Sequence, residues 1–538
     1  MTFNLIERAW LPARRLSGAV QVIAPHQINS GFEPDPIVAL DFPRPDWNAA
    51  VTEFLIGLLA VVQAPATPEN WAALWSNPPT PEALKAALAP LAFAFNLDGE
   101  GARCFQDLDE LADADETAIT QMLIEFPGES TVKKNTDLFV KRGERALTMA
   151  EAAAALITLQ TYSPSGGAGH RTSMRGGGPF TTLIATRRPK GADAIVTLWD
   201  RLWTNVPAAG SDYLPQPDDP ISDWVRIFPY LGQTPSSAKG DPQAVFTPEL
   251  AHPFQAFFGM PRRIRLRIDE DGMTRFYRTK PWGVNYTGWK HPLSPYYRAP
   301  SGEDLPMHAR SGPPSWRDWP ALWALSPDGK TKRAQCVATF IEQRARFLPS
   351  GSRALTELSA VGYDMDNMKA LRWVTQIAPW LPGLDSDDRE ERLKLIATLV
   401  EAGGEAASAT RVAVRTALYG VRTKDGRYTI QDTVKADAGQ NPADEFWAAT
   451  EPEFRAALNA LASNLDDRRV REEFQAGMRK AAHRIFNLRA STDDLIDGDI
   501  ERSLQALGQL RNAFSESGKV AEKLGIAVAR QKTKGKAG

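Results

Sequence analysis

The sequence predicts an α+β protein in which a large mixed N-terminal domain precedes an all-helical C-terminal domain. Alternating apolar residues in the first 25 residues, and again over residues 262–280, indicate short strands in the N-terminal domain. Beyond residues 379–383 proline becomes rare, and apolar residues follow a helical spacing almost to the end of the chain. We therefore expect a mixed domain over residues 1–380 and a helical domain over residues 385–530.

Helix start signals in the N-terminal domain lie between these strand segments. Asp46 is the expected cap of an amphipathic helix over residues 47–62. Thr148 and Glu151 have the spacing of a capping box and predict a helix that continues to residue 161. Two further starts have a threonine, a first-turn proline and a glutamate in succession, at residues 67–69 and 80–82.

The C-terminal domain contains a series of long amphipathic segments. The first predicted helix begins near residue 386, is interrupted at Gly403 and Gly404, and is followed by a second one through Leu418. Later helices begin at residues 450, 466 and 492. Several such helices in sequence predict an antiparallel bundle. The small, polar and basic residues 531–538 predict a disordered tail.

Composition limits the class of protein. The chain has 538 residues, 43% of them apolar and 24% charged, which is ordinary for a soluble globular protein. Its two cysteines, Cys104 and Cys336, exclude a disulfide framework and fit a reducing cytoplasm. The N-terminus lacks a signal-peptide core, and the longest apolar run, residues 54–63, is too short to span a bilayer. We expect a cytoplasmic protein without membrane contact.

Charge is segregated along the chain although the formal net charge is only −2. Basic residues gather over residues 130–190 and again over residues 262–280, whereas residues 107–116 are strongly acidic. This distribution suits a subunit that touches nucleic acid on one face and protein on others. For any one basic run taken alone, a solvated surface is the simpler interpretation.

Residues 165–182 form the most informative segment. Six of these eighteen residues are glycine, and Arg171 and Arg175 stand among them. Glycine lets a backbone approach another molecule closely, and arginine offers forked donors to phosphate. The segment therefore predicts close contact with a nucleic acid, and a mobile surface loop is the alternative.

Residues 262–280 have the pattern of a β-hairpin with one basic face. Three isoleucine or leucine residues alternate with three arginines, and residues 270–272 supply the turn. On the returning strand, Phe276, Arg278 and Lys280 share one face. Such a hairpin can hold a long cation above a groove, and a sheet edge protected by charge is the alternative.

The sequence contains no recognisable catalytic constellation. It has no P-loop, no His-Glu-x-x-His motif and no Gly-x-Ser-x-Gly elbow. Its six histidines are dispersed without ligand spacing, so we expect no metal site and no cofactor. His170 alone is placed for function, where backbone packing or a phosphate contact is the preferred interpretation over acid–base chemistry.

Several motifs together resemble one known family. They are Leu-Ile-Glu-Arg-Ala-Trp-Leu-Pro at residues 5–12, Met-Arg-Gly-Gly-Gly-Pro-Phe-Thr-Thr at 174–182, Trp-Lys-His-Pro-Leu-Ser-Pro at 289–295 and Ala-Val-Gly-Tyr at 360–363. In this order they resemble the CasA family, the large subunit of the type I-E CRISPR surveillance complex Cascade. The resemblance implies a C-terminal four-helix bundle and a non-catalytic role.

The resemblance also implies a function. Such a subunit recognises the protospacer-adjacent motif (PAM) in double-stranded DNA, helps start strand separation and R-loop formation, and recruits a helicase-nuclease. Its other implied partners are the 5′ handle of the CRISPR guide RNA and the backbone, handle-capping and small subunits of Cascade. An enzyme that binds a phosphorylated small molecule at the glycine-rich segment is the alternative.

Candidate site residues follow from the resemblance position by position. The PAM-contacting residues are Ser165, Gly166, Gly167, Ala168, Gly169 and Arg171 in the glycine-rich segment, with Lys280 and Arg278 in the hairpin. The wedge that enters the duplex comprises Asp366, Asn367 and Met368. The residues that meet the guide RNA and a neighbouring subunit are Leu138, Phe139, Val140 and Lys141.

The chain departs from the family pattern in three places. Ser165 and Ala168 stand where relatives often have glycine, so we expect a different PAM preference. The hairpin lacks the cysteines with which some relatives could hold zinc, which again predicts no metal. Asp366 would repel phosphate, so the wedge position is less well supported than the glycine-rich segment.

Overall fold

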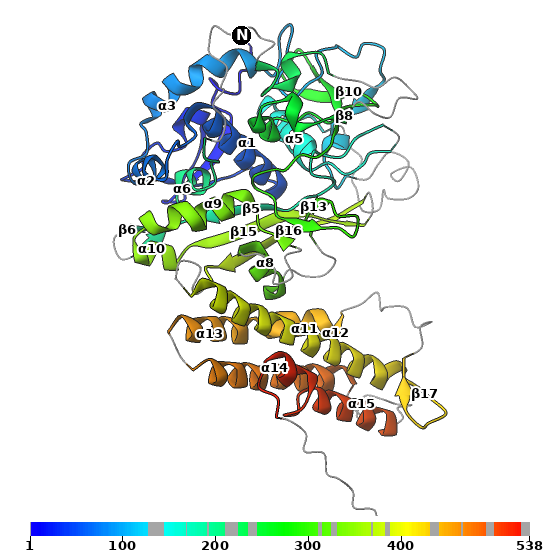
Figure 1. Ribbon diagram of the computed structural model, residues 1–538. Helices are drawn as coiled ribbons and strands as arrows, with labels where there is room; N and C mark the ends of the chain where they lie inside the picture. Colours follow the sequence, from blue (N-terminus) through cyan, green and yellow to red (C-terminus); the bar gives the residue numbers. More distant parts are fainter. Residues whose placement is uncertain are drawn as a thin grey trace, which may run out of the picture. The chain divides into compact units, whose positions relative to one another are not determined.

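A computed structural model of the chain describes residues 2–126, 145–167, 169–190, 193–209, 224–234, 245–309, 315–323, 331–366, 369–381, 388–430, 441–463, 466–490 and 500–528. The chain divides into two compact units. The first unit comprises Met1–Ser311 and Thr331–Trp380, and the second comprises Gly312–Lys330 and Leu381–Gly538. Short sheets and helices build the first unit and helices dominate the second, which confirms the α+β fold class (Figure 1).

One segment differs from the predicted domain division. We placed residues 1–380 in one domain, but residues 312–330 belong to the helical unit. The cause is Trp316, which is fully buried and stacks on Phe454 with 4.3 Å between the ring centroids. Its indole N–H also donates to the carbonyl oxygen of Trp447 at 3.1 Å. Aromatic packing therefore holds this segment against the bundle.

The core of the first unit is built around helix α1 (Pro45–Gln63). Its length and composition would allow it to cross a membrane, but 83% of its most apolar window is buried, as expected of a core helix. The prediction that Asp46 caps α1 was wrong, because the helix already begins at Pro45, a residue preorganised for a first turn. Asp46 is instead buried and pairs with Arg44 at 3.0 Å.

The other helices of the first unit begin largely where the sequence predicts. Thr67 and Thr80 cap α2 (Pro68–Ser76) and α3 (Pro81–Leu88). Thr148 and Glu151 form the expected capping box of α5 (Met149–Tyr162), with the Thr148 N–H donating to Glu151 at 2.9 Å. Among the described residues of this unit, further helices are α6 (Leu198–Trp203), α9 (Gln335–Thr339) and α10 (Ser350–Ala354).

The strands of the first unit form several small sheets. Among the described residues, four of them have three strands, in the orders β2-β1-β3, β4-β10-β9, β13-β12-β14 and β16-β15-β5. Two-stranded pairs are β8 with β11 and β6 with β7. The bounds are β1 (Leu11–Arg15), β2 (Val20–Ile23), β3 (Ile37–Leu40), β4 (Glu116–Ala118), β5 (Thr181–Ala185), β6 (Arg188–Lys190), β7 (Asp193–Ile195), β8 (Val245–Phe246), β9 (Arg263–Ile268), β10 (Thr274–Lys280), β11 (Asn285–Tyr286), β12 (Tyr296–Arg298), β13 (Asp304–Pro306), β14 (Thr331–Lys332), β15 (Glu357–Asp366) and β16 (Lys369–Pro379).

The second unit is helical, with one short hairpin. Its elements are α8 (Trp319–Trp323), α11 (Arg389–Tyr419), β17 (Val421–Arg422), β18 (Tyr428–Thr429), α12 (Pro442–Ala449), α13 (Glu451–Ala462), α14 (Asp467–Ala490), α15 (Ile500–Ala513) and α16 (Lys519–Lys523). The predicted break at Gly403 and Gly404 was wrong, because α11 runs through both. A side chain at Gly403 would collide with the indole of Trp316, so this glycine makes room for packing.

Candidate nucleic-acid interface

The glycine loop, residues 165–169, follows α5 directly and is partly exposed. Gly166 and Gly167 are exposed, and Gly167 and Gly169 have φ angles of +97° and +80°. The loop closes on itself, since the N–H of Gly166 donates to His170 at 3.1 Å and the N–H of His170 donates to Gly167 at 3.2 Å. Ala168 lies outside the described residues. The positive φ angles explain why glycine occupies these positions.

Both ends of the basic hairpin, residues 262–280, hold this loop. Before the first strand, the Arg262 guanidinium donates to the carbonyl oxygens of Arg171, at 3.0 Å, and Pro164. Burial lowers the pKa of Arg262 to about 10. After the second strand, the N–H of Trp282 donates to the carbonyl oxygen of Gly169 at 2.8 Å. The loop and its flanking residues are therefore fixed to the open end of the hairpin, by the Arg262 side chain on one side and by the Trp282 backbone on the other.

These contacts place Lys280 beside the glycine loop. Lys280 ends β10, and the next two residues, Pro281 and Trp282, pack against Gly169, where an added Cβ would lie 2.7 Å from each. Arg171 completes the group, since its guanidinium carbon lies 5.9 Å from the centre of the Trp282 ring. The fold thus brings together residues that are separated by more than one hundred positions in the sequence.

The hairpin itself forms as the sequence predicts, with β9 and β10 antiparallel and Ile264 and Leu266 buried. Its basic face, however, is not free. The acidic segment, residues 107–116, pairs with successive cations of the hairpin. The pairs are Arg263 with Asp107 at 2.5 Å, Arg265 with Glu110, Arg267 with Glu116, Arg278 with Glu116 at 3.6 Å and Lys280 with Asp113.

This pairing changes the electrostatic interpretation of the hairpin. Arg265 is buried, so it supports the sheet rather than offering a charge to solvent. β10 lies between β4 and β9, whereas β9, which carries Arg263, Arg265 and Arg267, is an edge strand of this sheet, so the alternative interpretation of an edge protected by charge fits β9 and not β10. The Lys280 ammonium holds the pKa of Asp113 below its usual value. The acidic segment was identified in the sequence, but its partner was not.

A buried charged cluster ties the second half of the glycine-rich segment to the core. Arg175 donates to Glu53 of α1 at 2.8 Å, and only 3% and 4% of the two side chains are exposed. The Tyr162 hydroxyl at 2.5 Å and the Thr181 hydroxyl at 2.6 Å donate to the other oxygen of Glu53. Arg175 also donates to Ser294 at 2.9 Å. The cluster satisfies a carboxylate and a guanidinium that would be costly to bury alone.

Two of the family motifs, at residues 174–182 and 289–295, meet in this cluster. His291 and Ser294 belong to the Trp-Lys-His-Pro-Leu-Ser-Pro motif, and His291 lies 3.6 Å from Glu53. Burial, with Arg175 nearby, lowers the pKa of His291 well below its usual value. The motifs therefore serve the packing of the first unit. Glu53 joins the two motifs, but it was not identified from the sequence. The one sign of its importance in the sequence is that a charged residue stands within an apolar helix.

One wedge candidate, Asp366, lies at the end of a long hairpin. β15 and β16 pair from Glu357 with Pro379 as far as Asp366 with Lys369. Asp366 is exposed at this end, whereas Asn367 and Met368 lie outside the described residues. The proposed RNA-contacting residues also lie outside them, namely Leu138, Phe139, Val140 and Lys141.

The part of the chain that the structure describes contains no group of three or more histidine, cysteine or acidic side chains that could hold a metal ion. His170 lies next to the glycine loop, and burial together with nearby Arg262 lowers its pKa. The lowered pKa favours the neutral imidazole. A neutral imidazole among arginines fits packing or hydrogen bonding to a ligand.

Comparison with known families identifies the chain. The model of the family described as CRISPR-associated protein Cse1 matches residues 4–485. The chain belongs to the Cse1 family. This confirms the resemblance drawn from the sequence motifs, since CasA is another name given to Cse1 in a solved structure. No curated protein sequence matches the chain.

Solved structures share the Cse1 fold over almost the full length. The crystal structure of CasA from Thermus thermophilus has a TM-score of 0.65 and 19% identity, covering 98% of this chain and 100% of that one. Cse1 from Acidimicrobium ferrooxidans has a TM-score of 0.68 and 18% identity, covering 98% and 99%. A chain of a CRISPR RNA-guided surveillance complex has a TM-score of 0.62 and 18% identity, covering 91% and 99%.

Proposed function

We propose that this Cse1 protein is the non-catalytic DNA-recognition subunit of a type I-E CRISPR RNA-guided surveillance complex. In this role it recognises the PAM in duplex DNA through the minor groove, helps start strand separation and R-loop formation, and recruits the helicase-nuclease. Its partners within the complex are the 5′ handle of the guide RNA and the other Cascade subunits. The observation that carries the proposal is the attachment of the glycine loop to the Lys280 end of the basic hairpin.

The geometry suits a reader of the minor groove. That groove is narrow and its pattern of donors and acceptors is degenerate, so proteins read it by shape and a few donors. Gly166 and Gly167 present backbone without side chains, which allows close approach. Lys280 supplies a donor beside them for a base acceptor or a phosphate. Sequence reading then passes to pairing between guide and target.

A hairpin tip fits the opening of the duplex next to the PAM. Unstacking one base step costs about a few kcal/mol, and proteins often meet this cost by inserting a rigid element. The β15–β16 hairpin is such an element, and we propose that Asp366, Asn367 and Met368 act there as the wedge. We further propose that Leu138, Phe139, Val140 and Lys141 dock on the guide RNA and a neighbouring subunit.

The first test removes the Lys280 ammonium. Lys280→Ala in the assembled complex is expected to weaken binding to PAM-containing duplex and to reduce the difference between duplexes that differ only at the PAM. Gel-shift titration of both duplexes measures this difference. Arg14→Ala, which removes an exposed arginine paired with Asp41, is the control. Unchanged PAM dependence would exclude Lys280 from the recognition site.

The second test concerns the carboxylate that Lys280 must leave when it binds DNA. Asp113 pairs with Lys280 while 77% of its own side chain is exposed, so DNA can displace it. Asp113→Asn is expected to strengthen binding to duplexes with and without a PAM, because the carboxylate that competes for Lys280 is gone. The ratio of the affinities for the two duplexes is expected to become smaller. Asp41→Asn is the matched control, and weaker binding by Asp113→Asn would contradict the competition.

A phosphorylated small molecule at the glycine loop is the other function that the sequence left open. It predicts turnover by the isolated chain, whereas our proposal predicts none. The described arginines beside the loop, Arg262 and Arg171, supply positive charge next to its backbone, which favours a polyanion over a reacting group held by an acid or base.

A further inference from the structure

Trp282, just after the basic hairpin, has a backbone conformation that large side chains seldom adopt. Its φ angle is +66°, in the left-handed region where a residue with a Cβ is strained. Phe105 and Leu111 also have positive φ angles, and both are fully buried, so packing in the core explains them. Trp282 is partly exposed, so its strained backbone calls for a different explanation.

The path of the chain beyond the hairpin accounts for this backbone conformation. Gly283 follows Trp282, and a Cβ at Gly283 would collide with the carbonyl oxygen of Pro261, so the chain passes very close to the start of the hairpin. On the other side, Pro281 restricts the residue before it to extended backbone, which keeps Lys280 in β10. The chain therefore turns sharply at Trp282, between a fixed strand end and a close backbone contact.

The turn brings Trp282 against two of the proposed DNA contacts at once. Its N–H donates to the carbonyl oxygen of Gly169 at 2.8 Å, and the Cδ2 atom of its ring would lie 3.0 Å from a Cβ added at that glycine. The guanidinium carbon of Arg171 lies 5.9 Å from the centre of the same ring, and its Nε–H donates to Gly283 at 3.5 Å. A glycine or asparagine would fit the backbone better, so the ring is the reason for a tryptophan here.

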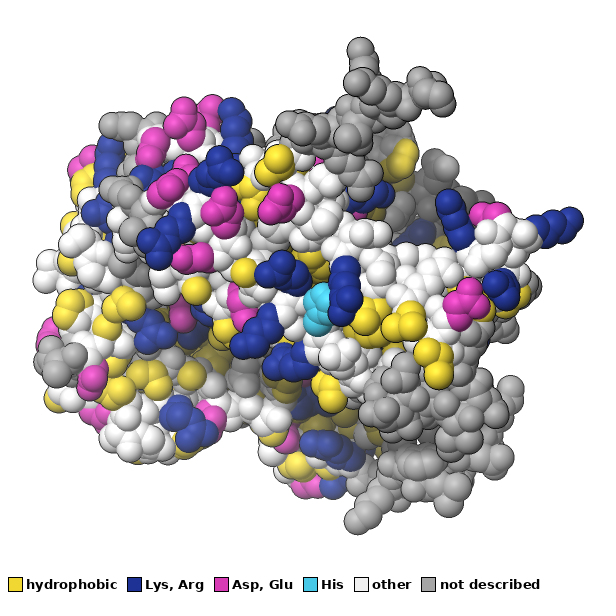
Figure 2. Space-filling model, turned by 90° about the horizontal axis from the view of Figure 1, so that it is seen from below, with side chains coloured by type: hydrophobic (Ala, Val, Ile, Leu, Met, Phe, Trp, Pro, Cys, Tyr) yellow, Lys and Arg dark blue, Asp and Glu magenta, His cyan; other side chains and the backbone are white. Residues whose placement is uncertain are grey.

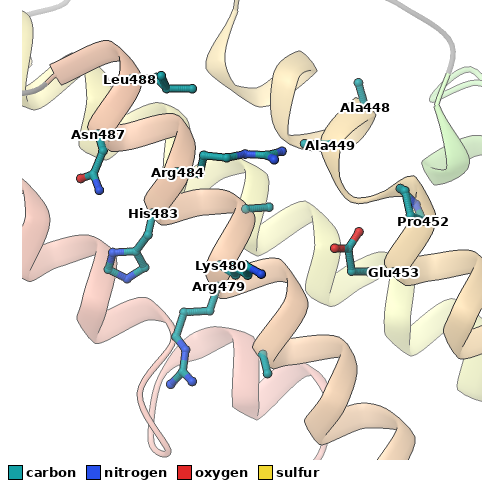
Figure 3. A pocket seen from close by; sticks show the side chains of 12 residues that line it. Ala448, Ala449, Pro452, Glu453, Arg479, Lys480, His483, Arg484, Asn487 and Leu488 are labelled. Atoms are coloured by element: carbon teal, nitrogen blue, oxygen red, sulfur yellow. The ribbon is translucent and has the colours of Figure 1, made fainter.

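Position rather than charge alone distinguishes Arg171 from many other cations of the chain. Figure 2 shows a face of the molecule on which lysine and arginine side chains gather around a histidine. In Figure 3, Arg484 of α14 extends into the groove between α14 and the helices α12 and α13. The residues that line this groove include no tryptophan, tyrosine or phenylalanine. Arg171, in contrast, has a ring beside it, and that ring also contacts the glycine loop.

We propose that Trp282 is a positioning residue for PAM recognition, which holds the Arg171 guanidinium next to the glycine loop so that it meets a phosphate of the duplex. This inference rests on the proposed function. An aromatic ring contacts the face of a guanidinium, whereas the N–H donors lie in its plane, so the ring contact is compatible with hydrogen bonds to phosphate. An arginine that is already held in place also loses less side-chain entropy when DNA binds.

The test is a double-mutant cycle in the assembled complex, with fluorescence anisotropy of a labelled PAM-containing duplex as the measure of affinity. Trp282→Leu removes the ring without changing any charge and is expected to weaken binding about two- to fivefold, the range of an exposed cation–π contact. Arg171→Gln should weaken binding at least as much and lower the slope of log affinity against log salt by about 0.9, the value for one phosphate contact. The double variant should bind like Arg171→Gln alone.

Three further variants separate the ring from the backbone and from the fold. Trp282→Phe keeps an aromatic ring and should retain most of the affinity. Trp282→Asn suits left-handed backbone better than leucine does, so it should lose as much affinity as Trp282→Leu only if the ring is responsible. Phe347→Leu is the control, because it removes a ring 4.9 Å from another guanidinium of the first unit, that of Arg346. Thermal unfolding of each variant shows whether the first unit is still folded.

Three results would overturn the proposal. Losses by Trp282→Leu and Arg171→Gln that multiply in the double variant would show that the ring acts on DNA or on the fold and not through Arg171. Unchanged affinity in both Trp282→Leu and Trp282→Asn would leave the ring without a role. Unchanged affinity and salt slope in Arg171→Gln would remove its phosphate contact. None of these results alters the outcome expected for Lys280→Ala, so failure of this inference is distinguishable from failure of the proposed function.

Discussion

Arg175→Met is expected to lower the free energy of unfolding of the first unit by about 3–5 kcal/mol, the cost of leaving one member of a buried ion pair alone. Methionine fills much of the same space but cannot pair with Glu53. The carboxylate would keep its hydrogen bonds from Tyr162 and Thr181 but lose its only described guanidinium partner, which lies 2.8 Å away. Burial leaves no water to replace it, since 4% of the Glu53 side chain is exposed.

Arg187→Met is the matched control for this prediction. Arg187 pairs with Glu357 at 3.2 Å, but about a third of each side chain is exposed. An exposed pair contributes about 0–1 kcal/mol, so this variant should unfold almost like the original chain. Urea unfolding followed by tryptophan fluorescence compares the two. Equal losses would show that the Glu53 cluster contributes no more than a surface pair.

The outcome of that comparison bears on how the family motifs are interpreted. From the sequence, the arginine in the glycine-rich segment is a candidate for contact with phosphate. The structure separates the two arginines of this segment, because Arg175 is buried on Glu53 whereas Arg171 stays near the surface beside Trp282. A motif can therefore be specific to a family because it builds the scaffold on which the contacting loop is held.

Local signals in the sequence predicted local structure well. The capping box at Thr148 and the alternation over residues 262–280 both gave the element that the structure contains. These succeed because each signal and its effect lie within a few residues. The division of the chain into a mixed part and a helical part followed from the same reasoning.

Signals that depend on distant partners were missed or misread. Gly403 indicated a helix break, but its role is to admit the indole of Trp316, which lies 87 positions earlier in the sequence. The acidic segment and the basic hairpin were treated as separate surfaces, although they neutralise each other in the fold. Nothing in the sequence indicated which residues pair with Glu53. In each case the missing information was which side chains meet in space.

Gly169→Ala is expected to abolish most PAM-dependent binding by the assembled complex, whereas Gly167→Ala should weaken it less, because the added methyl group only restricts the approach to DNA. Both residues have positive φ angles, +80° and +97°, so an alanine costs each about 1–2 kcal/mol of backbone strain. They differ in surroundings. An added Cβ at Gly169 would lie 2.7 Å from the Trp282 nitrogen and the Pro281 Cβ, while one at Gly167 meets nothing within 4 Å.

This difference isolates the contact on which recognition depends in our proposal. Alanine at residue 169 must push the loop away from the end of the hairpin and break the 2.8 Å hydrogen bond from Trp282, which separates the loop from Lys280. Alanine at residue 167 leaves that contact intact. Titration of duplexes with and without the PAM measures the ratio of the two affinities for each variant. Thermal unfolding shows whether the first unit is still folded. If both alanine variants lose discrimination between the two duplexes to the same extent, PAM recognition depends on the backbone flexibility of the loop rather than on its attachment to the hairpin. If neither loses it, the glycine loop and Lys280 do not act as one recognition surface, because separating them would then have no effect on DNA.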